Sequence, residues 1–162
     1  MGIYFNPNHT DFCNAVNHSQ IYVDKTELIQ YTNSVLFGEQ KYICVSRPRR
    51  FGKSMAANML TAYYSRGCDS KKLFQELKIA TRPDFEKHLN QYNVIHLNMQ
   101  SFLSKTQTIE QMIALVTKAV GRDLLRAYPD IDYLDKSILT FMLDDVYQNY
   151  QVPFIFIIDE WD

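Results

Sequence analysis

The chain has 162 residues, 46% of them hydrophobic and 22% charged, with a formal net charge of −1. This length is enough for one domain with a buried core, and the composition excludes a disordered chain. The balanced charge excludes a global basic field, so nucleic-acid binding would need a local patch. The three cysteines form no C-x-x-C pair, which favours a reducing, cytoplasmic compartment over a disulfide framework or a zinc site. The longest apolar run, Phe154 to Ile158, is too short to span a membrane.

The first forty residues are expected to form an N-terminal extension. Residues 1–20 show no periodicity and are expected to be irregular. A short β-type run at 21–23 precedes a helix predicted over roughly 25–33, because Asp24 and Glu27 have the spacing of a capping box.

From residue 41 onward, apolar runs alternate with helical patterns. Strands are predicted at 42–45, buried on both faces, and at 93–99 and 154–158. Helices are predicted after Lys53, from the Thr108–Gln111 capping box to Pro129, over roughly 132–150, and in short pieces near 73–77 and after Pro83. This alternation predicts an α/β fold over 41–162, with a mostly parallel sheet flanked by helices.

The strand predicted at 42–45 runs into a loop that ends in Gly52-Lys53-Ser54, where a helix is predicted to start. In a phosphate-binding loop, successive backbone N–H groups surround phosphate oxygens and the helix N-terminus adds its dipole. Gly52 would permit the close approach, Lys53 would reach the β- and γ-phosphates, and the Ser54 hydroxyl would ligate magnesium. An isolated Gly-Lys-Ser tripeptide occurs by chance about as often as it marks a phosphate-binding loop. Here the strand predicted before it and the helix predicted after it favour the phosphate-binding loop.

The loop departs from the pattern G-x-x-x-x-G-K-[ST], because its first glycine would fall at Arg47. Pro48 stiffens it. Its three arginines either add positive charge near the phosphates or face solvent or another subunit. The nucleotide-binding candidates are Arg47, Pro48, Arg49, Arg50, Phe51, Gly52, Lys53 and Ser54.

A second half of the site is predicted where the last strand ends in Asp159-Glu160. Asp159 would bind magnesium, and Glu160 would polarise the attacking water as the general base. Taken alone, Asp159 and Glu160 are better explained as an acidic turn at the end of a core strand than as a metal-binding and catalytic pair. Ligands of parallel sheets bind beyond the carboxyl ends of the strands. Both the Gly-Lys-Ser loop and the Asp159-Glu160 strand end are predicted at such ends, so the two motifs together favour a nucleotide-binding site over an acidic turn. Together the motifs predict binding of ATP and Mg²⁺, with Lys53 and Glu160 as catalytic residues.

Three segments resemble the predicted AAA-ATPase-like family: Tyr22-Val23-Asp24-Lys25-Thr26, the loop from Arg47 to Ser54, and Ile158-Asp159-Glu160 with Asp162 two residues on. The resemblance covers about Tyr22 to Asp162. It implies a three-layer P-loop NTPase fold, Mg-ATP binding and, in the complete protein, ATP hydrolysis. Members often continue into a nuclease-like domain of the PD-(D/E)XK type. The resemblance therefore implies that this chain is an N-terminal part, truncated after the acidic Walker B strand.

Several interpretations stay open at this stage. The Tyr22–Thr26 segment is either a helix cap, in which Asp24 satisfies backbone donors, or a contact for the nucleotide base. The alternative to ATP hydrolysis is a nucleotide-sensing or nucleic-acid-binding module without turnover, which would use the Arg47–Arg50 cluster. A small-molecule kinase is a third possibility, for which the sequence offers no acceptor pocket or lid. His96, on a predicted strand, is expected to be a hydrogen-bonded interior residue.

Overall fold

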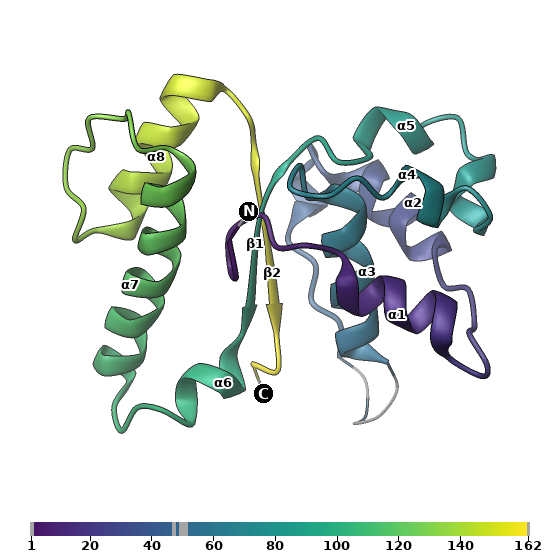
Figure 1. The fold of residues 1–162 in the computed structure, drawn as a ribbon, viewed down its shortest axis with the longest axis horizontal. Helices are drawn as coiled ribbons and strands as arrows, with labels where there is room; N and C mark the ends of the chain where they lie inside the picture. The colour runs from purple at the N-terminus through teal and green to yellow at the C-terminus, as the bar shows by residue number, and fades with distance from the viewer. Residues whose placement is uncertain (1, 47, 49–51, 162) are drawn as a thin grey trace.

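The structure, a computed structural model, describes residues 2–46, 48 and 52–161. Its centre is a parallel pair of strands, β1 (Asn93–Asn98) and β2 (Phe154–Asp159). Their register runs from Asn93 opposite Phe154 to Asn98 opposite Asp159. Helices lie on both sides of this pair (Figure 1). The predicted α/β character is confirmed, around a two-stranded parallel sheet.

The helices divide between the two sides of the sheet. On one side lie the elements that precede β1, and on the other those that lie between β1 and β2 (Figure 1). The first group is α1 (Thr10–His18), α2 (Glu27–Val35), η1 (Glu39–Lys41), α3 (Lys53–Tyr64), α4 (Lys71–Phe74), η2 (Lys78–Thr81) and α5 (Phe85–His88). The second group is α6 (Met99–Leu103), α7 (Ile109–Ala127) and α8 (Leu139–Tyr150).

Alternate residues of the strands enter two separate hydrophobic clusters. Val94 and Ile157 belong to the cluster that includes α3, whereas Ile95 and Leu97 belong to the cluster that includes α7 and α8. This division follows from the strand geometry, in which successive side chains point to opposite faces. Full burial of each such aliphatic side chain stabilises the fold by about 2 kcal/mol. The sheet is therefore held from both faces.

The N-terminal residues are more ordered than the sequence predicted. Residues 1–20 were expected to be irregular, but α1 forms there, with the Thr10 N–H donating to Asn8 Oδ1 at 3.2 Å and with Phe12 buried. Phe5 forms an antiparallel bridge with Ile95, which covers one edge of β1. The expectation was wrong because the apolar stripe of this short helix is too sparse to be recognised without its packing partners.

The helices predicted from periodicity are largely confirmed. At the start of α7, the Gln111 N–H donates to Thr108 Oγ1 at 3.2 Å, as predicted, while the Gln111 side chain accepts from the N–H of Gln107 at 2.9 Å. The last helix is shorter than predicted. Before it, Asp135 Oδ1 accepts the N–H and hydroxyl of Ser137 at 2.7 and 2.6 Å. Such local hydrogen bonds compete with helix formation, so α8 begins only at Leu139.

The strand predicted at 42–45 is wrong. These residues have no regular secondary structure, and Tyr42 and Val45 are 86% and 51% exposed. The backbone of Tyr42 is extended, at φ −91° and ψ 101°, but a strand also needs a neighbour to which its N–H and C=O groups bond. No described residue supplies that neighbour. The run at 21–23 is likewise unpaired in the part of the chain that the structure describes.

The capping box predicted for Asp24 and Glu27 is wrong in detail. Helix α2 begins at Glu27, and its N-cap residue Thr26 makes no side-chain cap bond. Instead Asp24 Oδ1 accepts the N–H and the hydroxyl of Thr26 at 2.8 and 2.7 Å, and Asp24 Oδ2 accepts the N–H of Lys78 at 2.7 Å. The Asp24 carboxylate therefore ties the turn before α2 to η2.

We predict that Asp24→Asn lowers the free energy of unfolding by about 1 kcal/mol at pH 7, since this partly exposed carboxylate loses charge-assisted hydrogen bonds. Burial acts to raise the pKa of Asp24, but the hydrogen bonds from Lys78 and Thr26 outweigh it and lower the pKa. The carboxylate therefore stabilises the fold fully above its unfolded pKa of about 3.9, and this contribution is lost as the pH falls through the lower folded pKa.

Urea unfolding at neutral and acidic pH tests this, and the difference between the two proteins should shrink below about pH 4. Asp135→Asn is the matched control, because within the described residues the Asp135 carboxylate bonds only to Ser137 in its own turn, and it should lose less stability. A difference for Asp24→Asn that is the same at both pH values would contradict the role of its charge.

Candidate functional site

Gly52, the residue directly before α3, has a left-handed backbone conformation. Gly52 is the N-cap residue of α3 and adopts φ 81° and ψ 27°, the left-handed region that glycine enters without steric cost. Its C=O accepts the N–H of Ala56 at 3.0 Å, which starts the helix. The first N–H groups of α3 have no partner within the helix and carry the positive end of its dipole. Lys53 and Ser54 form the first turn.

Helix α3 packs against both strands and runs opposite to them (Figure 1). Thr61 Oγ1 lies 3.1 Å from His96 Nδ1 across this interface. In the second half of α3, Tyr63 and Tyr64 are buried at 0% and 2% exposure. Because the helix and strands are antiparallel, the start of α3 lies at the carboxyl ends of β1 and β2 (Figure 1). Ligands of parallel α/β sheets bind at this end.

Asp159 lies on the face of the sheet that α3 covers. It is the last residue of β2 and alternates with Ile157, which belongs to the α3 cluster. Its side chain is buried at 8% exposure, and its Oδ1 accepts the N–H of Glu160 at 3.0 Å. Burial lowers the pKa of His96 on the same face, although Asp159 and Asp11 act to raise it. The predicted interior hydrogen bond of His96 is confirmed by its contact with Thr61.

Glu160 adopts an unusual backbone conformation directly after β2. Its φ is 53°, which is uncommon for a residue with a side chain. A residue in this region costs on the order of 1 kcal/mol, and such conformations cluster at functional sites. The turn redirects the chain at the carboxyl end of the sheet, where its half-buried side chain is predicted to act.

The structure brings some of the predicted site residues together. Gly52, Lys53 and Ser54 lie at the same end of the molecule as Asp159 and Glu160 (Figure 1). Pro48 is exposed and has no regular secondary structure. The candidates that lie outside the described residues are Arg47, Arg49, Arg50, Phe51 and Asp162.

A metal site would depend on few protein ligands here. No group of three or more His, Cys, Asp or Glu side chains among the described residues is arranged to hold a metal ion. The magnesium prediction therefore depends on the Ser54 hydroxyl and the Asp159 carboxylate. Both are oxygen ligands of the kind that Mg²⁺ takes alongside substrate phosphates.

Sequence reasoning did not single out Lys25 as a site residue. Its Nζ lies 3.6 Å from the point where a Cβ on Gly52 would stand. The one available signal was its place in the Tyr22–Thr26 segment, for which the helix cap was at least as favoured as a contact with the nucleotide base.

Comparison with known families decides the relationship. The sequence model of a family described as predicted AAA-ATPase matches residues 8–162. The chain belongs to the predicted AAA-ATPase family. The resemblance predicted from the three motif segments is thus confirmed, and this family indicates nucleotide binding or hydrolysis in general. Comparisons with curated proteins and with solved structures gave no match. Within the described residues, none of the helices has the length and apolar character needed to cross a membrane.

We predict that Gly52→Ala destabilises the family member described here by about 1 kcal/mol, because an alanine at φ 81° is strained. Among the described residues, the new Cβ would make only ordinary contacts, at 3.6 Å to Lys25 Nζ and 4.0 Å to the Met55 Cβ, so the loss is expected from the backbone. Gly38→Ala is the matched control, because Gly38 has an ordinary φ of −92° and a Cβ there would also make only ordinary contacts, at 3.6 Å to the Val35 carbonyl oxygen and 3.9 Å to the Gln40 nitrogen. Urea unfolding should show a loss for Gly52 and no loss for Gly38. Equal effects would contradict the assigned geometry.

Proposed function

We propose that this protein binds Mg-ATP at the start of α3 and that its acidic strand end serves ATP hydrolysis. One observation carries the proposal. Gly52, in a left-handed conformation, precedes α3 at the carboxyl end of the parallel strands. The last strand, β2, ends there in Asp159, which is buried on the face of the sheet that α3 covers. Family membership supports a nucleotide as the ligand. The three-layer P-loop arrangement belongs to the same proposal, since two paired strands leave the full strand order open.

In this proposal, the polyphosphate occupies the turn before α3. The N–H groups at the helix start donate to phosphate oxygens, and Gly52 allows the backbone to approach them closely. Lys53 supplies a positive charge to the β- and γ-phosphates. The remaining contacts are assigned to the loop residues Arg47, Pro48, Arg49, Arg50 and Phe51.

Magnesium is assigned to the Ser54 hydroxyl and the Asp159 carboxylate. When bound, the ion neutralises charge on the phosphates and orients them for attack. Asp159 is suited to this task because the strand fixes its backbone and the Glu160 N–H holds one of its oxygens. Glu160 is assigned the role of general base, which would accept a proton from the attacking water.

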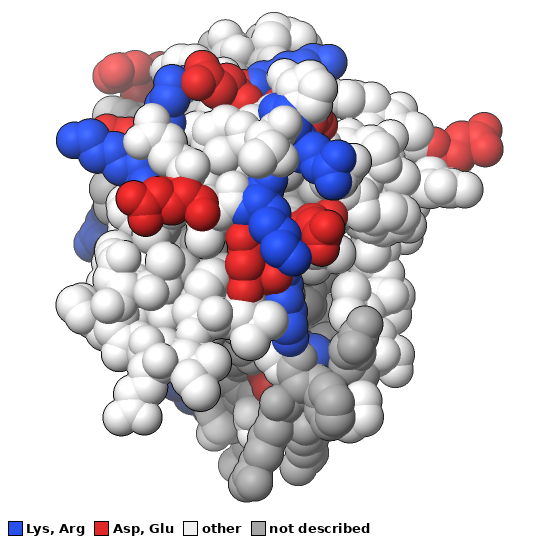
Figure 2. Space-filling view, turned by 90° about the vertical axis from the view of Figure 1, so that its right-hand side faces the viewer, with Lys and Arg blue, Asp and Glu red and all other residues white. Residues whose placement is uncertain are grey.

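The alternative function is nucleic-acid binding without ATP turnover, in which the Arg47–Arg50 cluster would contact the phosphates of the nucleic acid. Figure 2 shows the face built by the helices before β1, on whose upper part basic and acidic side chains are intermixed, while much of the lower described surface is uncharged. Such a face offers no broad basic field to the phosphates of a nucleic acid. The arginines on which this alternative depends lie outside the described residues, so the alternative is left to the binding experiment.

We predict that Lys53→Ala lowers the affinity for Mg-ATP by about a hundredfold or more, because the phosphate charge loses its cationic partner. Isothermal titration calorimetry measures this directly. Lys72→Ala is the control, because it removes one positive charge from an exposed position on α4 and should leave the affinity unchanged. Unchanged ATP binding by Lys53→Ala would reject the assigned site, and salt-dependent nucleic-acid binding by that variant would favour the alternative.

We predict that Glu160→Gln keeps Mg-ATP affinity and lowers the rate of ATP turnover about a hundredfold or more, since an amide cannot accept the proton from water. The measurements are calorimetry for binding and phosphate release for turnover. Glu76→Gln, at an exposed position, is the control and should change neither quantity. Undiminished turnover in Glu160→Gln would remove Glu160 from the role of general base.

A further inference from the structure

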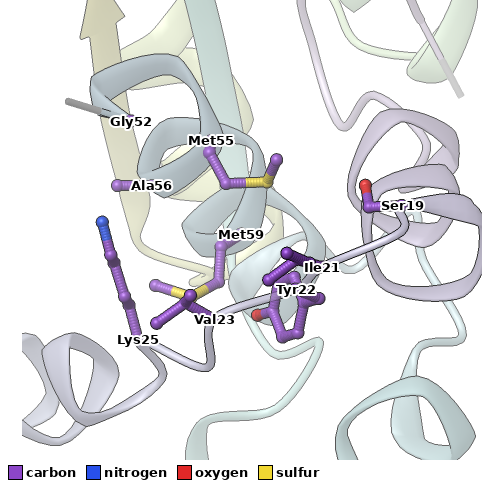
Figure 3. Close-up of a pocket in the computed structure, with 9 residues that line it drawn as sticks. All are labelled: Ser19, Ile21, Tyr22, Val23, Lys25, Gly52, Met55, Ala56 and Met59. Atoms are coloured by element: carbon purple, nitrogen blue, oxygen red, sulfur yellow. The ribbon is translucent and has the colours of Figure 1, made fainter. Parts of the chain in front are cut away.

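A pocket adjoins the turn before α3 and is not used by the phosphate and metal site. It has a volume of about 350 Å³ and lies between the segment around Ile21–Lys25 and the first two turns of α3 (Figure 3). This volume falls within the range of small-molecule sites in proteins. Gly52 lines the pocket and also forms the turn assigned to the phosphates. The pocket therefore borders that turn at Gly52.

The walls of the pocket are mostly apolar. Ile21 and Val23 contribute from the extended segment, and Met55 and Met59 contribute from one side of α3 (Figure 3). Ile21, Val23 and Met55 are 84%, 64% and 38% exposed, so the protein itself leaves these side chains uncovered. Methionine side chains adapt well to the shape of a flat aromatic group and make favourable contacts with it.

Lys25 is the one charged side chain among the described residues that line the pocket. It extends along the pocket toward Gly52, and its Nζ lies 3.6 Å from the position of a Cβ on that glycine (Figure 3). In the described structure it forms no ion pair with a carboxylate. A cation at this place lies where the apolar pocket meets the turn assigned to the phosphates.

The residues on either side of Lys25 hold its backbone in place. Asp24 accepts three hydrogen bonds, two from Thr26 and one from the N–H of Lys78. Thr26 is fully buried, and its Oγ1 accepts the N–H of Ile79 at 3.1 Å. In the Asp-Lys-Thr sequence, Asp24 and Thr26 thus fix the backbone by hydrogen bonds to η2. Lys25 between them presents an exposed amine toward the start of α3.

We propose that this pocket holds the nucleoside part of the bound nucleotide, with Lys25 contacting the phosphates next to it. The proposal rests on the proposed function, because it assumes a polyphosphate at the start of α3. An apolar, open-sided pocket suits the flat faces of a base, and a single amine at the phosphate end matches the charge of the ligand. In this proposal, the Tyr22–Thr26 segment both fixes the turn before α2 to η2 and contacts the nucleotide.

Calorimetry with two probes, Mg-ATP and Mg-tripolyphosphate, separates the pocket from the phosphate site. The wild-type chain should bind ATP more tightly than tripolyphosphate. Val23→Trp, which fills the pocket from an exposed position, should weaken ATP binding about tenfold and leave tripolyphosphate binding unchanged. Ile113→Trp is the matched control, because Ile113 is 57% exposed on α7, and it should alter neither. Lys25→Met should weaken the binding of both probes.

The outcomes distinguish the pocket proposal from the function on which it rests. Equal affinity of the wild type for the two probes would overturn the pocket and leave the phosphate site standing. A wild type that binds neither probe would overturn both. Met55→Ala, which removes one wall of the pocket, is the second variant should Val23→Trp fail to fold by circular dichroism. An unchanged ratio of ATP to tripolyphosphate affinity in folded Val23→Trp or Met55→Ala would also overturn the pocket.

Discussion

The packing of α3 across the β1–β2 pair is the interaction on which the rest of the structure depends. The contact between Thr61 and His96 joins the helix to β1, and the buried rings of Tyr63 and Tyr64 anchor its second half. Tyr64 also contacts α2, through hydroxyl hydrogen bonds at 2.6 Å to Thr32 and 2.7 Å to Asn33. With its carboxyl-terminal half fixed in this way, the amino-terminal end of α3 has one position, at the carboxyl ends of the strands.

This position determines what the neighbouring segments can do. The Gly52 turn places the amino-terminal end of α3 beside the strand end that carries Asp159, because both lie on the same face of the sheet. The Asp24–Thr26 turn is tied to η2 and therefore holds Lys25 against the start of α3. Three segments that are distant in the sequence thus meet at one end of the fold, and each contributes a different kind of group: a backbone turn, a carboxylate and an amine.

Sequence patterns predicted the elements whose signals are local. The apolar stripe of α7 and its Thr108 cap, the run that forms β2, and the Gly-Lys-Ser start of α3 can each be recognised from a few neighbouring residues. The segment 42–45 has an equally apolar composition but forms no strand, because strand formation depends on a partner that composition does not reveal. The position of α1 depends in the same way on packing against α3, which a sparse pattern does not predict.

The same distinction between local and tertiary signals applies to the candidate site. The left-handed conformation of Gly52 follows from the motif, because glycine is favoured there. The left-handed Glu160 and the approach of Lys25 to Gly52 are consequences of tertiary structure, and nothing in the residue types alone indicates them. Family membership indicates nucleotide binding or hydrolysis in general, whereas the assignment of individual residues to the nucleotide is our proposal from the geometry.

The central claim is that the start of α3 and the end of β2 face one metal–nucleotide complex. Nuclear magnetic resonance with Mn²⁺ in place of Mg²⁺ tests it most directly, because the paramagnetic ion broadens the signals of nearby amide protons. The account predicts that Mn-ATP broadens the amides of Ser54 and Asp159 together, while Mg-ATP broadens neither. Broadening at Ser54 without Asp159, or at neither residue despite bound ATP, would contradict it.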